Sequence, residues 1–301
     1  AWAGHYADCG LDFCQAARRA WQRFLIGRYG TVERLRKAWG RDAEEIRSFE
    51  DVPVPGKKVR LAEPELGDFF DPQRHRMLVD YNEFVALTTS QRIAELAEFV
   101  KRESRGKLLC GALFGYWGGY GDWLGKHAQQ SGHAMPEPAF RSPNLDYIAA
   151  PFYYGDRDVC GPSTWSLPVD TLQLYGKVVV NEADTPTYLH EGFEWLRPKT
   201  LGESVEVLKR DFAATLSKGM LQWWFFSHLG GSKLLEQGPE IIKLAGELNR
   251  VMEESLQTDR SSVSEVAFVY DRHSLLCIHP HSMLPGFIYY QMPELMRMGA
   301  P

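Results

Sequence analysis

Apolar residues recur at helical spacing in the first third of the chain, and charged residues occupy the opposite face. Three helices are predicted on this ground, over residues 11–27, 31–39 and 74–105. Thr31 is a residue type that caps the start of a helix, and Gly106 stops the longest of the three. The intervening stretch 40–73 is charged and contains four prolines, which predicts a surface loop.

Farther along, the pattern changes to short continuous apolar runs. Such runs are typical of strands in a parallel sheet that is buried on both faces. We predict strands over residues 107–116, 146–154, 176–184, 219–228 and 264–271. Helical patterns separate or follow them over 203–218, 239–256 and 285–298. The alternation of strands and helices predicts an α/β fold.

Polar and aromatic residues gather at the C-terminal ends of the first four of these strands. In a β/α barrel this edge is the catalytic face. A doubly wound sheet would instead need a glycine-rich phosphate turn, and the sequence GYWGGYG at 115–121 does not match G-x-G-x-x-G. The sequence therefore favours a barrel.

Composition narrows the functional classes. The chain has 301 residues and a formal charge of −5, with both signs interspersed, which argues against nucleic-acid binding. No apolar run approaches the roughly 20 residues of a membrane span. Five scattered cysteines indicate free thiols rather than a disulfide framework, so we expect a reducing, cytoplasmic compartment. No cofactor is predicted, and the 13% of aromatic residues suggest a site that stacks rings.

Glu182 is the strongest candidate for chemistry. A carboxylate at the mouth of a valine-rich buried strand is unfavourable unless it has partners or a catalytic role. The structural alternative is an ion pair with an arginine such as Arg157. Aromatic and polar side chains on neighbouring strand ends suit a sugar, because rings stack on its C–H faces while hydroxyls and amides bond its hydroxyls. Trp223 and Trp224 are adjacent, so at most one of them can point into a barrel.

Four motifs in order carry a resemblance to a known family. They are Asn-Glu-Ala-Asp at 181–184 after GKVVV, PFYYGDR at 151–157, Trp-Trp-Phe at 223–225 and RYGTVERLRKAWG at 28–40. Together they resemble the family 42 glycoside hydrolases, and more specifically their β-galactosidase-like relatives in the clan of retaining β/α-barrel glycosidases. The match runs with gaps from about Gly4 to the C-terminus.

The resemblance implies roles for particular residues. Glu182, at the end of the seventh barrel strand, would be the nucleophile that forms a covalent glycosyl-enzyme. Tyr154 would hydrogen-bond Glu182 and help to keep it ionised. Trp223 or Trp224 would form the platform under the sugar ring. The substrate-binding residues that the resemblance implies are Asn181, Tyr154, Tyr116, Trp117, Trp223, Trp224, Arg157 and Asp184.

The resemblance also implies that the chain is an internal stretch of a longer protein. Residues 1–258 would be the C-terminal half of a TIM barrel, and 263–301 the start of a flavodoxin-like domain that contributes to trimers in some relatives. The family's acid/base glutamate belongs to a second Asn-Glu pair, which we expect upstream of residue 1. We therefore expect the 301-residue chain alone to be inactive. Cys9 and Cys14 lie where some relatives carry a zinc cluster, but structural zinc needs four ligands, so no metal is our leading expectation.

Two other interpretations remain open from the sequence. One is a carbohydrate-binding barrel that has lost the acid/base and is not catalytic. The other is an unrelated β/α enzyme, such as a decarboxylase or aldolase, in which Glu182 transfers a proton. A Schiff-base enzyme is disfavoured because Lys177 stands at the start of its strand rather than at the end. An Asn-Glu pair just before Ala1 would favour the glycosidase over the binding protein.

Overall fold

A parallel four-stranded sheet is the centre of the computed structural model, which describes residues 13–60, 62–64, 67–116, 132–191, 197–279 and 284–299. The strands lie side by side in chain order, each parallel to the next. They are β1 (Gly111–Leu113), β2 (Tyr147–Pro151), β3 (Val178–Ala183) and β4 (Leu221–Trp224). All four strands predicted within the first 228 residues are confirmed, although each is shorter than its apolar run.

The register of the strands separates two faces of the sheet. On one face Ile148 of β2 is paired with Val179 of β3, and both are buried. On the other face Leu113, Val178 and Trp223 are 37%, 45% and 42% exposed. The sheet is therefore buried on one face and partly open on the other, whereas continuous apolar runs predict burial on both.

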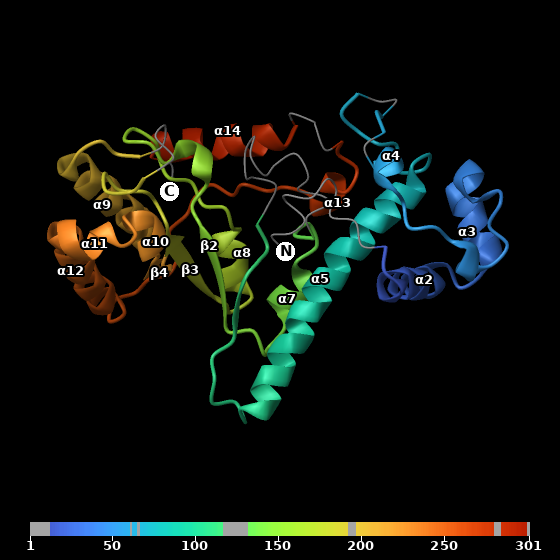
Figure 1. Cartoon of the computed structure of the whole chain (residues 1–301), viewed down its shortest axis with the longest axis horizontal. Helices are drawn as coiled ribbons and strands as arrows, with labels where there is room; N and C mark the ends of the chain where they lie inside the picture. Colours follow the sequence, from blue (N-terminus) through green and yellow to red (C-terminus); the bar gives the residue numbers. More distant parts are fainter. Residues whose placement is uncertain are drawn as a thin grey trace.

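Helices from the middle and end of the chain cover the buried face. One core cluster packs apolar residues of α5, α7 and α8 against β2 and β3, and a second packs α9 and α12 against β3 and β4. These helices are α5 (Arg76–Glu103), α7 (Glu137–Arg141), α8 (Val169–Leu174), α9 (Leu201–Ser217) and α12 (Pro239–Ser255). Figure 1 shows α9 and α12 at the end of the molecule opposite to α2 and α3, with α5 between them.

The N-terminal helices form a separate core against α5. Helix α2 (Gln15–Tyr29) and α3 (Val32–Trp39), capped by the Thr31 side chain, pack Trp21 and Trp39 against it. The fully buried Asp80 of α5 ties the three helices together. Its carboxylate accepts hydrogen bonds from Arg28 at 2.6 Å, from the Trp39 indole at 2.9 Å and from the Tyr29 hydroxyl. Aromatic packing and the buried contacts of Asp80 stabilise this unit.

Shorter elements complete the described chain. They are η1 (Gly40–Ala43), η2 (Phe49–Asp51), α4 (Lys57–Arg60), η4 (Tyr154–Asp156), α10 (Phe226–Leu229), α11 (Lys233–Gln237), α13 (Arg272–Leu275) and α14 (Leu284–Arg297). No helix in the described part of the chain has both the length and the apolar character that a membrane span requires.

One predicted strand is absent. The prediction of a strand over 264–271 is wrong, because the chain there forms no strand of the sheet. Val266 and Val269 are 52% and 85% exposed, so the apolar residues of this run are not packed as a strand would pack them. The run ends at Asp271, whose carboxylate caps α13 by accepting hydrogen bonds from the amides of His273 and Ser274. Residues 264–271 are apolar enough for a strand, but a strand also needs a neighbouring strand with which to form hydrogen bonds.

Candidate active site

Glu182 lies on the partly open face of the sheet, near the C-terminal end of β3. Its register partners are Pro151 of β2 and Trp223 of β4. The side chain is 9% exposed. Burial raises the pKa of Glu182 to about 7, the negative charge of Asp184 adds to this rise, and the positive charge of Arg157 opposes it. Close to neutral pH the carboxyl group therefore exists in both protonation states.

Asp184, two residues farther along, is fixed by several donors. The Tyr154 hydroxyl donates a hydrogen bond to its Oδ2 at 2.8 Å, and Nη1 of Arg157 forms an ion pair with its Oδ1. Nδ1 of His228 lies 3.7 Å from Oδ2. Tyr154 thus bonds Asp184 in this structure, whereas the resemblance implies a bond to Glu182. Arg157 likewise pairs with Asp184 rather than with Glu182.

Arg157 joins Asp184 to the segment that follows β2. The guanidinium group is fully buried and donates to the carbonyl oxygens of Phe152 and Tyr153, the latter at 3.1 Å. Its Cζ atom lies 3.9 Å from the ring centroid of Tyr154, which is a close cation–π contact. Burial is the main cause that raises the pKa of Tyr154, and the nearby Asp184 charge adds to it. The phenol therefore stays protonated and serves as a hydrogen-bond donor.

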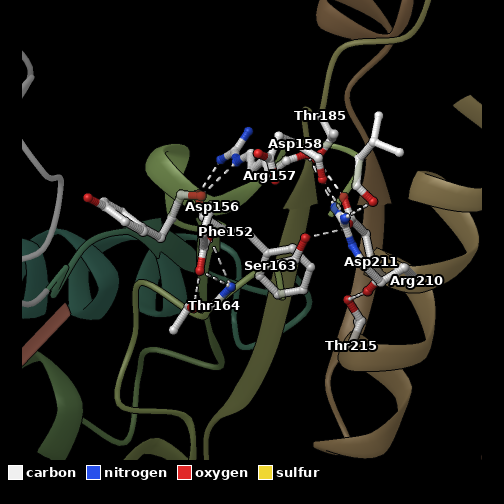
Figure 2. A network of polar contacts seen from close by, with 12 residues as sticks. Phe152, Asp156, Arg157, Asp158, Ser163, Thr164, Thr185, Arg210, Asp211 and Thr215 are labelled. Carbon is white, nitrogen blue, oxygen red and sulfur yellow. Dashed lines mark hydrogen bonds and ion pairs between the residues drawn. The ribbon is translucent and has the colours of Figure 1, made fainter. Parts of the chain in front are cut away.

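A second polar network connects the segments that follow β2 and β3 with helix α9 (Figure 2). Asp156 accepts hydrogen bonds from the amide and hydroxyl of Thr164. Asp211 of α9 accepts from the hydroxyls of Ser163 and Thr185, the latter at 2.6 Å. Ser163 has a φ of 57°, an unfavourable conformation for a residue with a side chain, and its bond to Asp211 helps to hold it. Through Asp211, helix α9 fixes the segments that follow β2 and β3.

The two tryptophans of β4 face opposite ways, as predicted. Trp223, the register partner of Glu182, is 42% exposed on the open face. Trp224 is buried among α9 and α12, where its indole donates to Oδ1 of Asn249 at 2.8 Å. Asn181 also lies on the helix-covered face, and its amide donates to the Thr215 hydroxyl at 3.1 Å. Trp223 is therefore the tryptophan that the structure brings to Glu182, and Asn181 and Trp224 lie on the other face.

The end of β1 is only partly described. Tyr116 is 5% exposed and stacks on His133, with ring centroids 4.9 Å apart. Trp117 and Cys9, two of the predicted site residues, lie outside the described residues. Cys14 is the N-cap of α2, and its sulfur accepts from the amide of Ala17. Within the described residues no group of three or more His, Cys, Asp or Glu is arranged to hold a metal ion.

Sequence reasoning missed a pair of histidines, of which His228 lies near Asp184. His190 follows β3, His228 lies in α10 after β4, and their ring centroids are 5.4 Å apart. Phe225 contacts His228 edge-on at 5.3 Å and Trp223 at 5.7 Å. The positions of both histidines in the sequence could have identified them as candidates. His228 ends the apolar run of β4, and His190 follows closely after the Asn-Glu-Ala-Asp motif.

A carboxyl group with a raised pKa, beside an exposed tryptophan at the C-terminal edge of a parallel sheet, is an arrangement suited to a glycosidase. The comparisons agree with that class. Residues 5–119 match the glycoside hydrolase family 42 model, which is described as beta-galactosidase. The resemblance seen in the sequence is confirmed over this stretch.

Two curated relatives and one solved structure can be named. Beta-galactosidase YesZ of Bacillus subtilis is 44% identical over 54 residues, which are 17% of this chain and 8% of that protein. Beta-galactosidase LacZ of Heyndrickxia coagulans is 32% identical over 62 residues, 20% of this chain and 9% of that protein. The matched segments thus span less than a tenth of these relatives.

The solved structure shows the fold. The catalytic domain of beta-amylase from Paenibacillus polymyxa superposes with a TM-score of 0.50 at 14% identity, over 81% of this chain and 55% of that one. This likeness supports an α/β fold with a parallel sheet. The family match ends at residue 119, before Glu182, so the role of Glu182 depends on the geometry and not on the comparison.

Proposed function

We propose that this chain carries the nucleophile of a retaining, β-galactosidase-like glycoside hydrolase, and that the nucleophile is Glu182. The observation that carries the proposal is the position of its carboxyl group beside Trp223, on the open face and at the C-terminal edge of the sheet. An exposed indole offers a flat apolar surface for the C–H face of a sugar. A carboxylate next to that surface can reach the anomeric carbon of the bound sugar.

The chemistry proposed for Glu182 is nucleophilic displacement. The ionised carboxylate attacks the anomeric carbon and forms a glycosyl ester as the bond to the leaving oxygen breaks. A second carboxyl group protonates that oxygen and then activates the water that hydrolyses the ester. We place this second group upstream of residue 1, as the family resemblance implies. Arg157 favours the ionised form of Glu182, because its positive charge lowers the pKa of that carboxyl group.

We also propose that the four strands are the C-terminal half of a β/α barrel and that residues 1–258 belong to it. The one-sided arrangement supports this, because a barrel has its helices outside and its side chains inside, while a doubly wound sheet has helices on both faces. Residues 263–301 would begin a further domain of flavodoxin-like type. Its predicted strand over 264–271 is not formed here, so this part of the proposal depends on the resemblance and on helix α14.

The family relation supports a carbohydrate substrate. A homotrimeric assembly and a cytoplasmic location are proposals that follow from the resemblance and from the scattered cysteines. Light scattering coupled to gel filtration of the full-length protein tests the assembly, and a monomeric mass would contradict the trimer.

Glu182→Gln tests the nucleophile directly. In the full-length protein we expect this variant to lose turnover of 4-nitrophenyl β-galactoside by at least about 10³-fold while it still binds galactose. Glu191→Gln is the matched control, because the Glu191 side chain is 79% exposed and pairs with Lys233 at the surface. We expect its turnover to stay within two-fold of the parent protein.

A mechanism-based inactivator gives the second test. A 2-fluoro-galactoside should label Glu182, and peptide mass spectrometry identifies the labelled residue. Label on any other residue would refute the assignment. Sugar binding without turnover or labelling, in a full-length protein with no second Asn-Glu pair, would instead favour the non-catalytic carbohydrate-binding protein.

A further inference from the structure

Two neighbouring charged residues of helix α9 hold the segments that follow β2 and β3, and we call this pair the α9 clamp. Its members are Arg210 and Asp211, whose side chains are 24% and 4% exposed. Asp211 accepts a hydrogen bond from the hydroxyl of Thr185 at 2.6 Å through Oδ2 and another from the hydroxyl of Ser163 through Oδ1. Nη2 of Arg210 lies 2.9 Å from Oδ1 of Asp211. One carboxylate thus connects both segments to the same helix (Figure 2).

Arg210 binds the backbone of the segment that follows β2. Its Nη1 atom donates to the carbonyl oxygens of Asp158 at 2.6 Å and of Val159 at 3.4 Å. Its Nη2 atom donates to the carbonyl oxygen of Arg157 at 3.3 Å. A planar guanidinium group presents five donors in a fixed arrangement, so it can hold several carbonyl groups at once. Arg210 therefore fixes the main chain at Arg157.

The α9 clamp holds both members of the ion pair between Arg157 and Asp184. At one end, Arg210 binds the carbonyl group of Arg157 itself. At the other end, Asp211 binds Thr185, the residue that follows Asp184. The relative position of the two paired side chains thus depends on contacts with a helix on the other face of the sheet.

The charges of this ion pair act on Glu182. Burial is the largest cause that raises the pKa of Glu182, the charge of Asp184 adds to the rise, and the charge of Arg157 opposes it. Within the described part of the chain, the charges of the α9 clamp are not among those that shift this pKa. Two further titratable groups, Tyr154 and His228, contact Asp184. The position of the ion pair therefore governs how readily the carboxyl group of Glu182 ionises.

We propose that Arg210 and Asp211 are positioning residues for the reaction at Glu182, which they serve by holding the Arg157–Asp184 ion pair in place without touching the sugar. The proposal rests on the proposed function for the reaction itself. A reacting group needs supporting contacts that keep its neighbours within about 0.5 Å of their productive positions. The α9 clamp supplies such contacts to two separate segments through one pair of side chains.

Thr185→Val and Arg210→Met test the proposal in the full-length protein through the pKa of Glu182. Carbon-13 NMR of protein labelled at the glutamate carboxyl carbon measures this pKa, and the signal of Glu182 is the one that disappears in Glu182→Gln. Thr185→Val frees Asp184 to move away, so we expect the pKa of Glu182 to fall by about 0.5 pH unit. Arg210→Met frees Arg157 to move away, so we expect a rise of about the same size.

Matched variants separate positioning from damage to the fold. Thr185→Ser keeps the hydroxyl group that binds Asp211 and should restore the pKa of the parent protein. Lys209→Met is the control for Arg210→Met, because Lys209 is its neighbour on α9 and its side chain is 50% exposed. This control should leave the pKa of Glu182 unchanged. Circular dichroism checks that every variant folds.

The pH profile of kcat/KM for 4-nitrophenyl β-galactoside connects this pKa with the reaction. Its acidic limb should move to lower pH in Thr185→Val and to higher pH in Arg210→Met. We expect kcat at the pH optimum to fall about ten-fold in both variants, with KM within about two-fold of the parent, because the α9 clamp does not touch the sugar.

The two proposals fail in different ways. An unchanged pKa in both variants, shifts in the same direction, or a pH profile that stays fixed while the pKa moves would overturn the role of the α9 clamp, whether or not the parent protein hydrolyses the galactoside. A parent protein without turnover would overturn the glycosidase function instead. The NMR titration would then still decide whether the α9 clamp positions the ion pair beside Glu182.

Discussion

Replacing Arg157 by methionine should destabilise the protein more than any change at a surface charge. The substitution keeps a long side chain of similar volume but removes the charge from a position that is 0% exposed. Asp184, whose side chain is 3% exposed, would then retain the Tyr154 hydroxyl as a donor but lose the guanidinium. A buried charge that loses its partner is strongly unfavourable.

The magnitude follows from the contacts that are lost. The bond to Asp184 is charge-assisted and contributes about 1.5–3 kcal/mol. The carbonyl groups of Phe152 and Tyr153 each lose a hydrogen bond of about 1 kcal/mol. Together these give a loss of about 4 kcal/mol, within the range of about 3–5 kcal/mol expected for breaking a buried pair from one side.

Urea unfolding at pH 7 measures the loss, provided that the slope of the transition is unchanged. The double variant Arg157→Met with Asp184→Asn removes both charges and should recover part of the stability, with a coupling energy of about 2 kcal/mol. Lys209→Met is the control, because Lys209 and Glu206 are 50% and 73% exposed, and it should cost less than about 0.5 kcal/mol. A loss below about 1 kcal/mol in Arg157→Met, or no coupling, would refute the reasoning.

Two further predictions concern the open face and the pKa of Glu182. Burial raises that pKa to about 7, so between roughly pH 4.5 and 7 the folded protein holds a proton that the unfolded chain has lost, and stability falls as pH rises through this window. In urea unfolding, the free energy of unfolding of Glu182→Gln should therefore equal that of the parent near pH 4.5. At pH 8 the variant should be more stable by about 1–2 kcal/mol, a value that allows for partial solvent screening. Equal stability of the two proteins at both pH values would contradict this prediction. Trp224→Ala should lower the free energy of unfolding by about 3–5 kcal/mol, because its indole is buried. Trp223→Ala should lower it by less than about 1 kcal/mol and should weaken galactose binding, measured by calorimetry, about ten-fold. The reverse pattern would mean that the two tryptophans are assigned to the wrong faces of the sheet.

The sequence was most informative where the alternation of side chains along a strand determines which face of the sheet each residue occupies. The alternation of side chains along a strand predicted that Trp223 and Trp224 point opposite ways, and the structure confirms it. The valine run before Glu182 predicted a strand, and β3 forms there with Glu182 near its end. Local pattern determines both results, because neighbouring positions in one strand need no knowledge of the rest of the chain.

The alternation of side chains could not predict which polar side chains pair with each other. Sequence spacing allowed Arg157 to pair with Glu182, but the structure pairs it with Asp184, two residues farther along and just after the end of β3. That choice depends on the conformation of the segment after β2, which includes the positive φ of Ser163 and its bond to Asp211 of α9. A contact between residues 48 positions apart leaves no mark in the local pattern.

The contrast between Glu182 and Asp184 is itself an argument about which carboxyl group reacts. Asp184 is fixed by the Tyr154 hydroxyl and by an ion pair with Arg157, so moving it would break several contacts at once. Within the described part of the chain no side chain hydrogen-bonds the carboxyl group of Glu182, so this group can approach a bound sugar without breaking such a bond. The contacts of Asp184 suit a group that positions its neighbours. We therefore propose Glu182 as the reacting group, with Asp184 orienting Tyr154, Arg157 and His228 beside it.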